Sequence, residues 1–349
     1  MKEPPLVSYV VAVYNMEETI GNTIESLLNQ DYPNKEIIVI NDGSVDNTEK
    51  ILKKYPIKYI TTENKGLSHA KTFGYKISKG EFIAYTDADC VLHHLWTKNM
   101  LEGFIDDNVA LVGGRTIYQT DGKCSSTYRS LEYAKRERNM KNSEVVWAGG
   151  QGSMFRRKIL DELGGFNPKW NWTEDAQISF VIIEHGYKII KKKDAITYHV
   201  ALSGFKRVVR KGYKNAKGYV RATISHPKTS LINKFNTTWL FPYDMVLLPF
   251  LYAFMILLGI LLLTISLLNF YLYLPIISEI IRPIMIWIMI LIGMFLFVYG
   301  FIPSYQVASH LKNKKLKNFV LTMALHHTRG LFWGLGLIIG IINTIIGKR

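Results

Sequence analysis

The sequence predicts an α/β domain with a mainly parallel sheet, followed by C-terminal transmembrane helices. Two observations support this prediction. In the first third of the chain, short β-branched runs alternate with segments of helical spacing, which is typical of parallel strands joined by helices. Beyond Pro242 the composition changes abruptly to long uncharged stretches. The 349 residues are enough for about two domains.

The expected elements of the first domain follow one another in a regular order. Apolar, β-branched runs predict strands at 7–14, 36–40, 57–60, 82–85 and 109–112. Apolar residues at helical spacing predict helices at 18–29, 46–55 and 67–77. Asp46 or Ser44 is expected to cap the second helix, and Thr173 to cap a later one. Another short strand is expected to end at His199.

Three C-terminal segments are apolar enough to be membrane spans, at about 245–268, 283–306 and 330–347. The last is marginal in length and Gly-rich, so it either spans the bilayer or re-enters it. Buried core helices of a soluble protein are the alternative. We therefore expect a first domain at 1–225 and an interfacial and membrane domain at 226–349. Because no secretory signal is apparent, we expect the first domain on the cytoplasmic side of a cell membrane.

The net charge of +15 is concentrated just before the first predicted span. Residues 188–234 contain thirteen lysines and arginines and one acid. This cluster suits an anionic lipid surface and the positive-inside rule. Residues 204–219 mix apolar and basic side chains as an interfacial helix would, although three glycines argue against a continuous helix. Nucleic-acid binding is disfavoured because membrane spans follow directly. Two cysteines provide no disulfide framework.

Asp87-Ala88-Asp89 follows the apolar run at 82–85 and is the most informative short motif. Residues at i and i+2 of an extended segment project to the same side. Two carboxylates on one side are suitable ligands for Mg²⁺ or Mn²⁺ and leave coordination positions for a phosphate. An Asx-rich turn after a strand is the alternative for such a motif read alone.

Polar residues also end the first two predicted strands, at the edge where the aspartates are expected. The first strand ends in Tyr14-Asn15-Met16-Glu17, and Asp42 ends the second. A carboxylate at Asp42 is able to accept hydrogen bonds from a base or a ribose hydroxyl. The sequence contains neither a P-loop nor a dinucleotide-binding glycine motif. A phosphate would therefore need a metal ion or basic side chains.

Three further segments carry candidate site residues. Lys71 lies in a helix start that could face a diphosphate, with an ordinary solvated lysine as the alternative. Gly150 lies in a glycine-rich stretch that permits close backbone approach to a ligand. Glu174 and Asp175 begin a helix, where acids are also favoured simply by the helix dipole.

Read in order, these motifs resemble glycosyltransferase family 2, an inverting family with the glycosyltransferase A fold. The resemblance covers residues 6 to about 200 and rests on five ordered signals after the first strand's Val13-Tyr14-Asn15. These signals are Asp-Gly-Ser-x-Asp-x-Thr from Asp42, Asn-x-Gly from Asn64, Asp87-Ala88-Asp89, Gly164-Gly165-Phe166 and Thr173-Glu174-Asp175. Ala12 stands where the family usually has proline, and Lys71 where arginine is common.

The resemblance implies a role for each motif. Asp42 would contact the nucleobase or ribose of a nucleotide-sugar donor, and Asp89 with Asp87 would hold Mn²⁺ or Mg²⁺ on its diphosphate. Asp175 would deprotonate the acceptor hydroxyl, with Glu174 beside it. Transferases of this fold often have a histidine ligand where His199 stands, although a structural histidine is an equal alternative. Tyr14, Asn15, Glu17, Lys71 and Gly150 would complete the donor site.

Arg207 and Arg210 are expected within reach of a diphosphate or an anionic lipid headgroup. Processive members of the family carry Gln-x-x-Arg-Trp in this region, and residues 205–211 lack that motif, which argues for transfer of a single sugar. The membrane segments favour a lipid or lipid-linked acceptor. A polyprenyl-phosphate sugar synthase and a non-catalytic glycan-binding or export protein are the alternatives.

Overall fold

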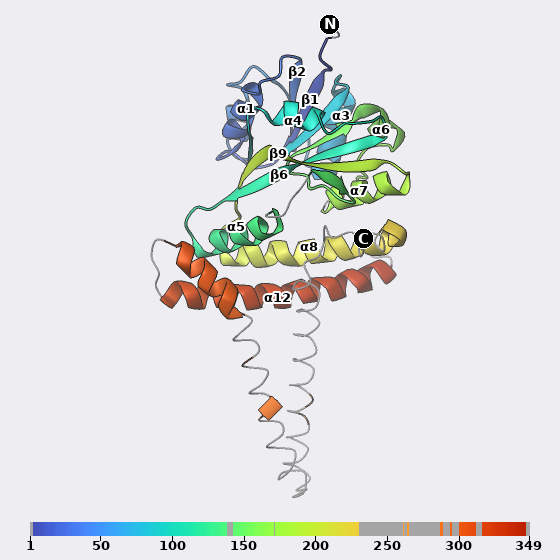
Figure 1. Ribbon diagram of the computed structural model, residues 1–349. Helices are drawn as coiled ribbons and strands as arrows, with labels where there is room; N and C mark the ends of the chain where they lie inside the picture. The colour runs from blue at the N-terminus through green and yellow to red at the C-terminus, as the bar shows by residue number, and fades with distance from the viewer. Residues whose placement is uncertain are drawn as a thin grey trace, which may run out of the picture.

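The computed structural model describes residues 3–137, 142–170, 172–229, 300–311 and 316–346, with a few isolated positions between 261 and 294. Within these residues the first domain is built on one nine-stranded sheet with helices on both faces (Figure 1). The strand order is β3-β2-β1-β4-β8-β6-β9-β5, and β7 pairs with β9. The predicted fold class is confirmed.

The first half of the sheet is parallel, and its strands are joined by helices. Its strands are β1 (Val7–Val13), β2 (Lys35–Asn41), β3 (Lys58–Thr61) and β4 (Phe82–Asp87). The connecting helices are α1 (Ile20–Leu28), α2 (Thr48–Leu52) and α3 (Leu67–Ile77). The carboxyl ends of β1, β2 and β4 therefore meet at one edge, as the sequence predicts.

The second half of the sheet is mixed, because β8 runs antiparallel between β4 and β6. Its strands are β5 (Cys90–Leu92), β6 (Val109–Gln119), β7 (Ser143–Val145), β8 (Ser153–Arg156) and β9 (Lys188–Val200). Its helices are α4 (Trp96–Leu101), α5 (Cys124–Glu137), α6 (Arg157–Glu162) and α7 (Glu174–Glu184). The strands predicted at 109–112 and before His199 are longer than expected.

The core explains why β1 is apolar along its whole length. Tyr9 and Val11 pack with α1, α2 and α4 on one face of the sheet, whereas Val10 packs with α3, α6 and α7 on the other. Successive side chains of a strand point to opposite faces, so a strand covered on both faces needs an unbroken apolar run.

The helix caps predicted at Asp46 and at Thr173 have different outcomes. Asp46 Oδ1 accepts a hydrogen bond from the Thr48 amide at 3.0 Å, so Asp46 does satisfy a donor at the start of α2. The cap predicted at Thr173 is wrong. Thr173 has a left-handed backbone (φ 61°), and its hydroxyl donates to the carbonyl oxygen of Trp172 instead of serving α7. Helix α2 is also shorter than the helix predicted at 46–55.

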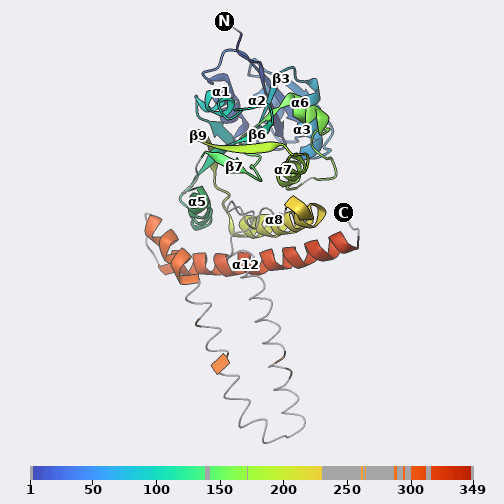
Figure 2. The ribbon, with the colours of Figure 1, turned by 45° about the vertical axis from the view of Figure 1, so that its right-hand side comes forward.

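Below the sheet, α8 (Phe205–Ser225) and α12 (Leu316–Ile345) lie side by side (Figures 1 and 2). Helix α8 is continuous, so its glycines do not break it. They serve close contacts instead, because a Cβ atom at Gly212 would lie 3.3 Å from Cγ of Arg329. On α12, a Cβ atom at Gly336 would lie 2.5 Å from the carbonyl oxygen of Tyr213.

The predicted membrane segments meet different outcomes. Residues 330–345 of the predicted segment form the second half of the longer helix α12, which begins at Leu316. By length and composition α12 is the one candidate membrane span among the described residues. The span predicted at 245–268 falls almost wholly outside the described residues. Of the span predicted at 283–306, residues 300–306 are described and helical, and the predicted boundary near residue 225 stays a prediction.

Candidate active site

The loops after β1 and β2 are tied together by their polar side chains. Asn15, with a left-handed backbone (φ 52°), accepts the Val45 amide on Oδ1 at 2.8 Å. Glu17 Oε2 accepts both the backbone amide and the side-chain amide of Asn47, at 2.8 and 2.7 Å. Asn15 and Glu17 therefore hold two loops at the carboxyl edge of the sheet, and Tyr14 beside them is 46% exposed.

Asp42 organises the loop that leads into α3. Its Oδ1 accepts the Lys65 amide and its Oδ2 accepts the Gly66 amide, each at 2.9 Å. The carboxylate is buried. Each oxygen keeps a second lone pair, so contact with a base or ribose stays a prediction beside this structural role.

The two aspartates of Asp87-Ala88-Asp89 belong to different local structures. Strand β4 ends at Asp87, whereas Ala88 and Asp89 form a turn before β5. The extended spacing predicted across both aspartates is therefore wrong, because the chain turns between them. The turn points Asp89 toward β9, where Cys90 pairs directly with His199.

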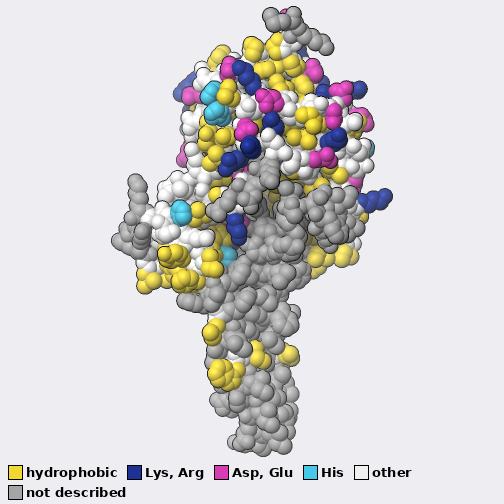
Figure 3. Space-filling view, viewed as in Figure 1, with side chains coloured by type: hydrophobic (Ala, Val, Ile, Leu, Met, Phe, Trp, Pro, Cys, Tyr) yellow, Lys and Arg dark blue, Asp and Glu magenta, His cyan; other side chains and the backbone are white. Residues whose placement is uncertain are grey.

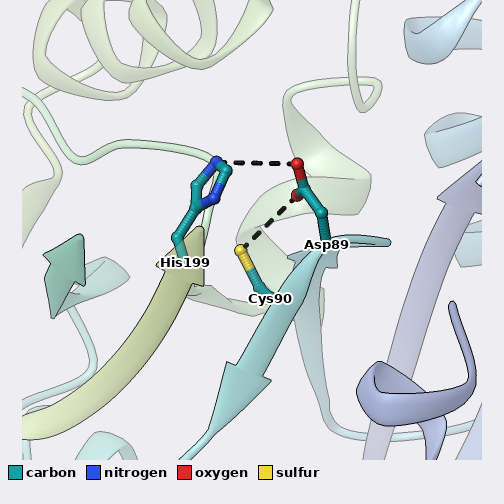
Figure 4. Close-up of side chains that lie close together, drawn as sticks. All are labelled: Asp89, Cys90 and His199. Carbon is teal, nitrogen blue, oxygen red and sulfur yellow. Dashed lines mark hydrogen bonds and ion pairs between the residues drawn. The ribbon is translucent and has the colours of Figure 1, made fainter. Parts of the chain in front are cut away.

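Asp89, Cys90 and His199 converge at this turn (Figure 4). Nε2 of His199 lies 3.7 Å from Oδ2 of Asp89, and Sγ of Cys90 lies 3.9 Å from Oδ1. One ligand atom from each of the three lies within 4.8 Å of the others. The His199 ring is buried beside Tyr118, with ring centroids 5.1 Å apart, and its Nδ1 has no hydrogen-bond partner.

The donor atoms suit Mn²⁺ or Mg²⁺ only in part. Asp89 and His199 supply a carboxylate and an imidazole, which suit Mn²⁺ and leave open positions for a diphosphate. Burial raises the pKa of the Cys90 thiol well above its usual value, so the thiol stays protonated. A soft, protonated sulfur is a poor ligand for these hard cations. The arrangement therefore fits a site that contains Asp89 and His199, whereas a part for Asp87, at the end of β4, stays a prediction.

A second cluster of charges joins Lys71, Glu174 and Asp175. Nζ of Lys71 lies 2.7 Å from Oε1 of Glu174, and the two side chains are 2% and 8% exposed. The lysine also lies 5.5 Å from the ring centroid of Phe166. Although burial opposes its charge, Glu174, Asp87 and Asp175 together raise the pKa of Lys71 and keep it protonated. The alternative of a solvated lysine is wrong.

Asp175 is half-buried at the start of α7 and has the properties of a base that works near neutral pH. Burial raises its pKa to about 7, and the nearby charge of Glu174 adds to that effect. Lys71 and hydrogen bonds from the Ala176 amide (2.9 Å) and the Gly150 amide (3.2 Å) oppose it. A strongly perturbed carboxylate of this kind is typical of catalytic sites.

Gly150 lies over this acid cluster. A Cβ atom at Gly150 would lie 3.2 Å from Nζ of Lys71 and 3.7 Å from Cβ of Asp175. The glycine therefore permits the close backbone approach that the sequence predicts, although the groups it approaches in the structure belong to the protein itself. Arg207 and Arg210, by contrast, are exposed on α8. Within the described part of the chain, neither arginine forms a hydrogen bond or an ion pair with Glu174 or Asp175.

The sequence did not reveal that α8 holds the loop before Asp175. Nε1 of Trp172 donates to Oδ1 of Asn215 at 2.8 Å, and Lys214 lies 4.9 Å from the Trp172 ring. A Cβ atom at Gly218 would lie 2.5 Å from Oγ1 of Thr173, the residue that precedes Glu174. These contacts join segments far apart in sequence, so no local pattern could have indicated them.

The fold matches solved glycosyltransferases. The chain is similar to the mannosyltransferase PcManGT from Pyrobaculum calidifontis, solved in complex with GDP-Man and Mn²⁺, with a TM-score of 0.62 and 16% identity. The match covers 100% of this chain and 89% of that chain. The first domain therefore has the glycosyltransferase A fold, which was the expectation from its motifs.

Residues 8–164 match the model of "Glycosyl transferase family 2", and this match supports the resemblance that the motifs indicate. It is 29% identical to the poly-beta-1,6-N-acetyl-D-glucosamine synthase of Staphylococcus epidermidis over 195 residues, which are 52% of this chain. It is 25% identical to glycosyltransferase AglE of Haloferax volcanii over 233 residues, 62% of this chain and 74% of that one. The match spans about half (47%) of the synthase.

Proposed function

We propose that this protein is a metal-dependent, inverting glycosyltransferase that moves one sugar from a nucleotide-diphospho-sugar to an acceptor at the membrane. The observation that carries the proposal is Asp175, a half-buried carboxylate whose pKa is raised to about 7, at the carboxyl edge of the sheet. A base with that pKa is half ionised at neutral pH and well matched to an acceptor hydroxyl. Glu174 lies beside it as a positioning residue.

The donor would be held by the loops and charges at the same edge. Asp89, Asp87 and His199 would ligate Mn²⁺ or Mg²⁺, which would neutralise the charge that develops on the departing nucleotide diphosphate. Asp42 and the loops that carry Tyr14, Asn15, Glu17 and Gly150 would surround the nucleotide and sugar. The donor of the mannosyltransferase structure, GDP-Man, belongs to the same chemical class and supports this proposal.

The acceptor would be a lipid or a lipid-linked sugar. Helix α8 carries seven lysines and arginines and no acid, and it contacts the loop before Asp175. A basic helix of this kind suits the anionic cytoplasmic face of a cell membrane. Arg207 and Arg210 are exposed at the start of α8, and we expect them to contact lipid headgroups. Contact of these two arginines with the donor diphosphate stays a prediction.

One alternative differs in its need for a base. A polyprenyl-phosphate sugar synthase would use a phosphate oxygen that is already ionised, so a tuned carboxylate would be unnecessary. The raised pKa of Asp175 therefore favours a hydroxyl acceptor. A non-catalytic glycan-binding or export protein would have no reason to keep the charges of Lys71, Glu174 and Asp175 together, since buried charges cost stability.

The test uses the detergent-purified full chain with Mn²⁺ or Mg²⁺ and a panel of nucleotide sugars, with and without membrane lipid extract. We expect lipid-dependent release of nucleotide diphosphate that is lost in Asp89→Ala and reduced at least a hundredfold in Asp175→Asn, an order of magnitude typical of a lost base. Asp107→Asn is the matched control, because Asp107 is fully exposed. Equal release by all four proteins would contradict the proposal.

The same reaction distinguishes the remaining possibilities. Retained activity of Asp175→Asn with a polyprenyl phosphate would identify the synthase alternative. Mass spectrometry of the product would count the sugars added to each acceptor. We expect one sugar, and a ladder of products would show that the enzyme is processive.

A further inference from the structure

Helix α12 has two faces of different character. Most of its buried residues face α8 and α5 and recur at helical spacing, at Thr322, Leu325, Arg329, Trp333, Gly336, Leu337 and Gly340. Five of its exposed apolar residues form a row on another face, at Leu331, Leu335, Ile338, Ile342 and Ile345. These five are spaced by alternating steps of four and three residues, which keeps them on one side of the helix.

The buried face is in contact with α8 along most of its length. Gly212 of α8 meets Arg329, Tyr213 meets Gly336, and Lys217 meets Gly340, so the two helices run side by side in the same direction. A small residue at each contact allows the backbones to approach closely. Arg329 also donates to Oε1 of Glu132 on α5 at 2.8 Å, which ties α12 to the helices beneath the sheet.

This packing is incompatible with α12 crossing a membrane. If α12 spanned the bilayer, the part of α8 beside it would enter the hydrocarbon as well. A Lys or Arg at the centre of a span is costly, because its charge leaves water for hydrocarbon. Helix α8 carries seven basic residues and no acid, so the entry of this helix into the hydrocarbon is strongly disfavoured.

We propose that α12 is an in-plane membrane helix whose row of exposed apolar residues is embedded in the surface layer of an anionic bilayer. At 30 residues, α12 is about 45 Å long, and its outer row carries no charge from Leu331 to Ile345. In Figure 3, hydrophobic side chains gather along the lower border of the described domain, at the level that α12 occupies in Figure 1.

The charge of α8 indicates that an anionic lipid surface covers the apolar row of α12. Its seven lysines and arginines lie on the helix that packs against the buried face of α12, away from the apolar row, and acidic lipid headgroups above a hydrocarbon layer match both features. A second copy of the chain would instead bring another basic helix toward this one. The in-plane position places the loop of Thr173 and Asp175 one helix layer above the lipid surface, because α8 lies between that loop and α12 (Figure 2).

The experiment measures depth rather than binding, since the segments predicted as spans would keep the protein in the membrane in either case. Single cysteines replace Leu331, Leu335, Ile338 and Ile342 in the full chain, which is reconstituted in phosphatidylcholine–phosphatidylglycerol vesicles. Each cysteine carries a fluorophore that is quenched by lipids labelled at known depths. The wild-type protein, whose Cys90 and Cys124 are buried, gives the background labelling. A label at Val45, which is 86% exposed on the first domain, is the unquenched control.

An in-plane helix gives the same shallow depth at all four positions. A spanning helix gives depths that change by about 1.5 Å per residue, or roughly 16 Å between the first and last labels. Such a gradient would overturn the proposal. So would an absence of quenching at all four positions, because a protein surface would then cover the row. The readout does not depend on transfer activity, so it stands or fails separately from the proposed function.

Discussion

The ammonium group of Lys71 lies 2.7 Å from the carboxylate of Glu174, and both side chains are almost completely buried beneath the glycine-rich loop. Lys71 comes from α3 and Glu174 from α7, so the pair joins the two helices on one face of the sheet. Asp175 follows directly and is the carboxylate that we propose as the base. The pair therefore sets the charge that surrounds Asp175.

Replacement of Lys71 by methionine should destabilise the protein strongly. The change leaves Glu174 buried without its partner, which typically costs about 3–5 kcal/mol. Thermal unfolding of the full chain in detergent measures the effect. The double variant Lys71→Met with Glu174→Leu should recover part of the loss, because it removes the unpaired charge.

Lys98→Met is the matched control for this stability prediction. Lys98 pairs with Asp31 at 2.6 Å, but the two side chains are 49% and 59% exposed. Solvent screens such pairs, so the expected cost is about 0–1 kcal/mol. Equal unfolding temperatures for Lys71→Met and Lys98→Met would show that the buried pair has no special importance.

The rate of transfer should fall as the pH falls through about 7, because Asp175 acts only when ionised and its pKa is raised to about 7. Glu174→Gln removes a like charge that raises this pKa. We therefore expect its acid limb to move to lower pH, by on the order of one unit. The pH dependence of kcat/KM measures the acid limb of the wild type and that of Glu174→Gln.

Glu162→Gln provides the control for the pH profile, since Glu162 lies away from Asp175 and accepts a hydrogen bond from Tyr187. Its acid limb should match that of the wild type. An unchanged limb in Glu174→Gln, or a wild-type rate that stays constant down to pH 5, would exclude Asp175 as the titrating base.

Binding of Mn²⁺ should depend on Asp89 and His199 but not on Cys90. Loss of a residue that only orients a metal ligand lowers metal affinity about ten- to hundredfold. Loss of a direct ligand should cost at least as much, so we expect the Mn²⁺ affinity of His199→Ala to fall by on the order of tenfold or more. Cys90→Ala should bind as the wild type does, since its thiol stays protonated. The electron paramagnetic resonance signal of free Mn²⁺ measures each affinity. Wild-type affinity in His199→Ala would show that the histidine is structural.

Gly218→Ala should lower kcat by displacing the loop before Asp175. Its added Cβ atom would lie 2.5 Å from Oγ1 of Thr173, so the loop or the helix has to move. A displacement of about 1 Å at a catalytic group can lower the rate up to about a hundredfold, and we expect kcat of Gly218→Ala to fall on the order of tenfold. Gly212→Ala makes the same change on the same helix, but its Cβ meets Arg329. Similar kcat values for the two variants would argue against a positioning role for α8.

The sequence was sufficient for the fold and for the order of the site motifs. Strand β1 is covered on both faces and therefore appears as a continuous apolar run, and the polar residues after β1, β2 and β4 follow from the parallel connections. His199 was a candidate ligand because it follows the apolar run at 195–198 and because transferases of this fold often have a histidine there. These features are local, so the period and composition of the chain determine them.

Local patterns could not show how the charges are paired. By its sequence Lys71 could face either a diphosphate or solvent, and only the packing of α3 against α7 places it on Glu174. The spacing of Asp87 and Asp89 suggested one extended strand, but the pairing of Cys90 with His199 turns the chain between them. In both cases residues far apart in sequence decide the outcome.

The C-terminal helix shows the same division most clearly. Composition alone was enough to predict an apolar helix at 330–347, because burial in lipid or protein requires such a run. Whether that helix crosses a membrane or lies along it depends on what its other face contacts. Only the tertiary structure decided that α12 packs along the basic helix α8, since glycines on both helices allow their backbones to meet.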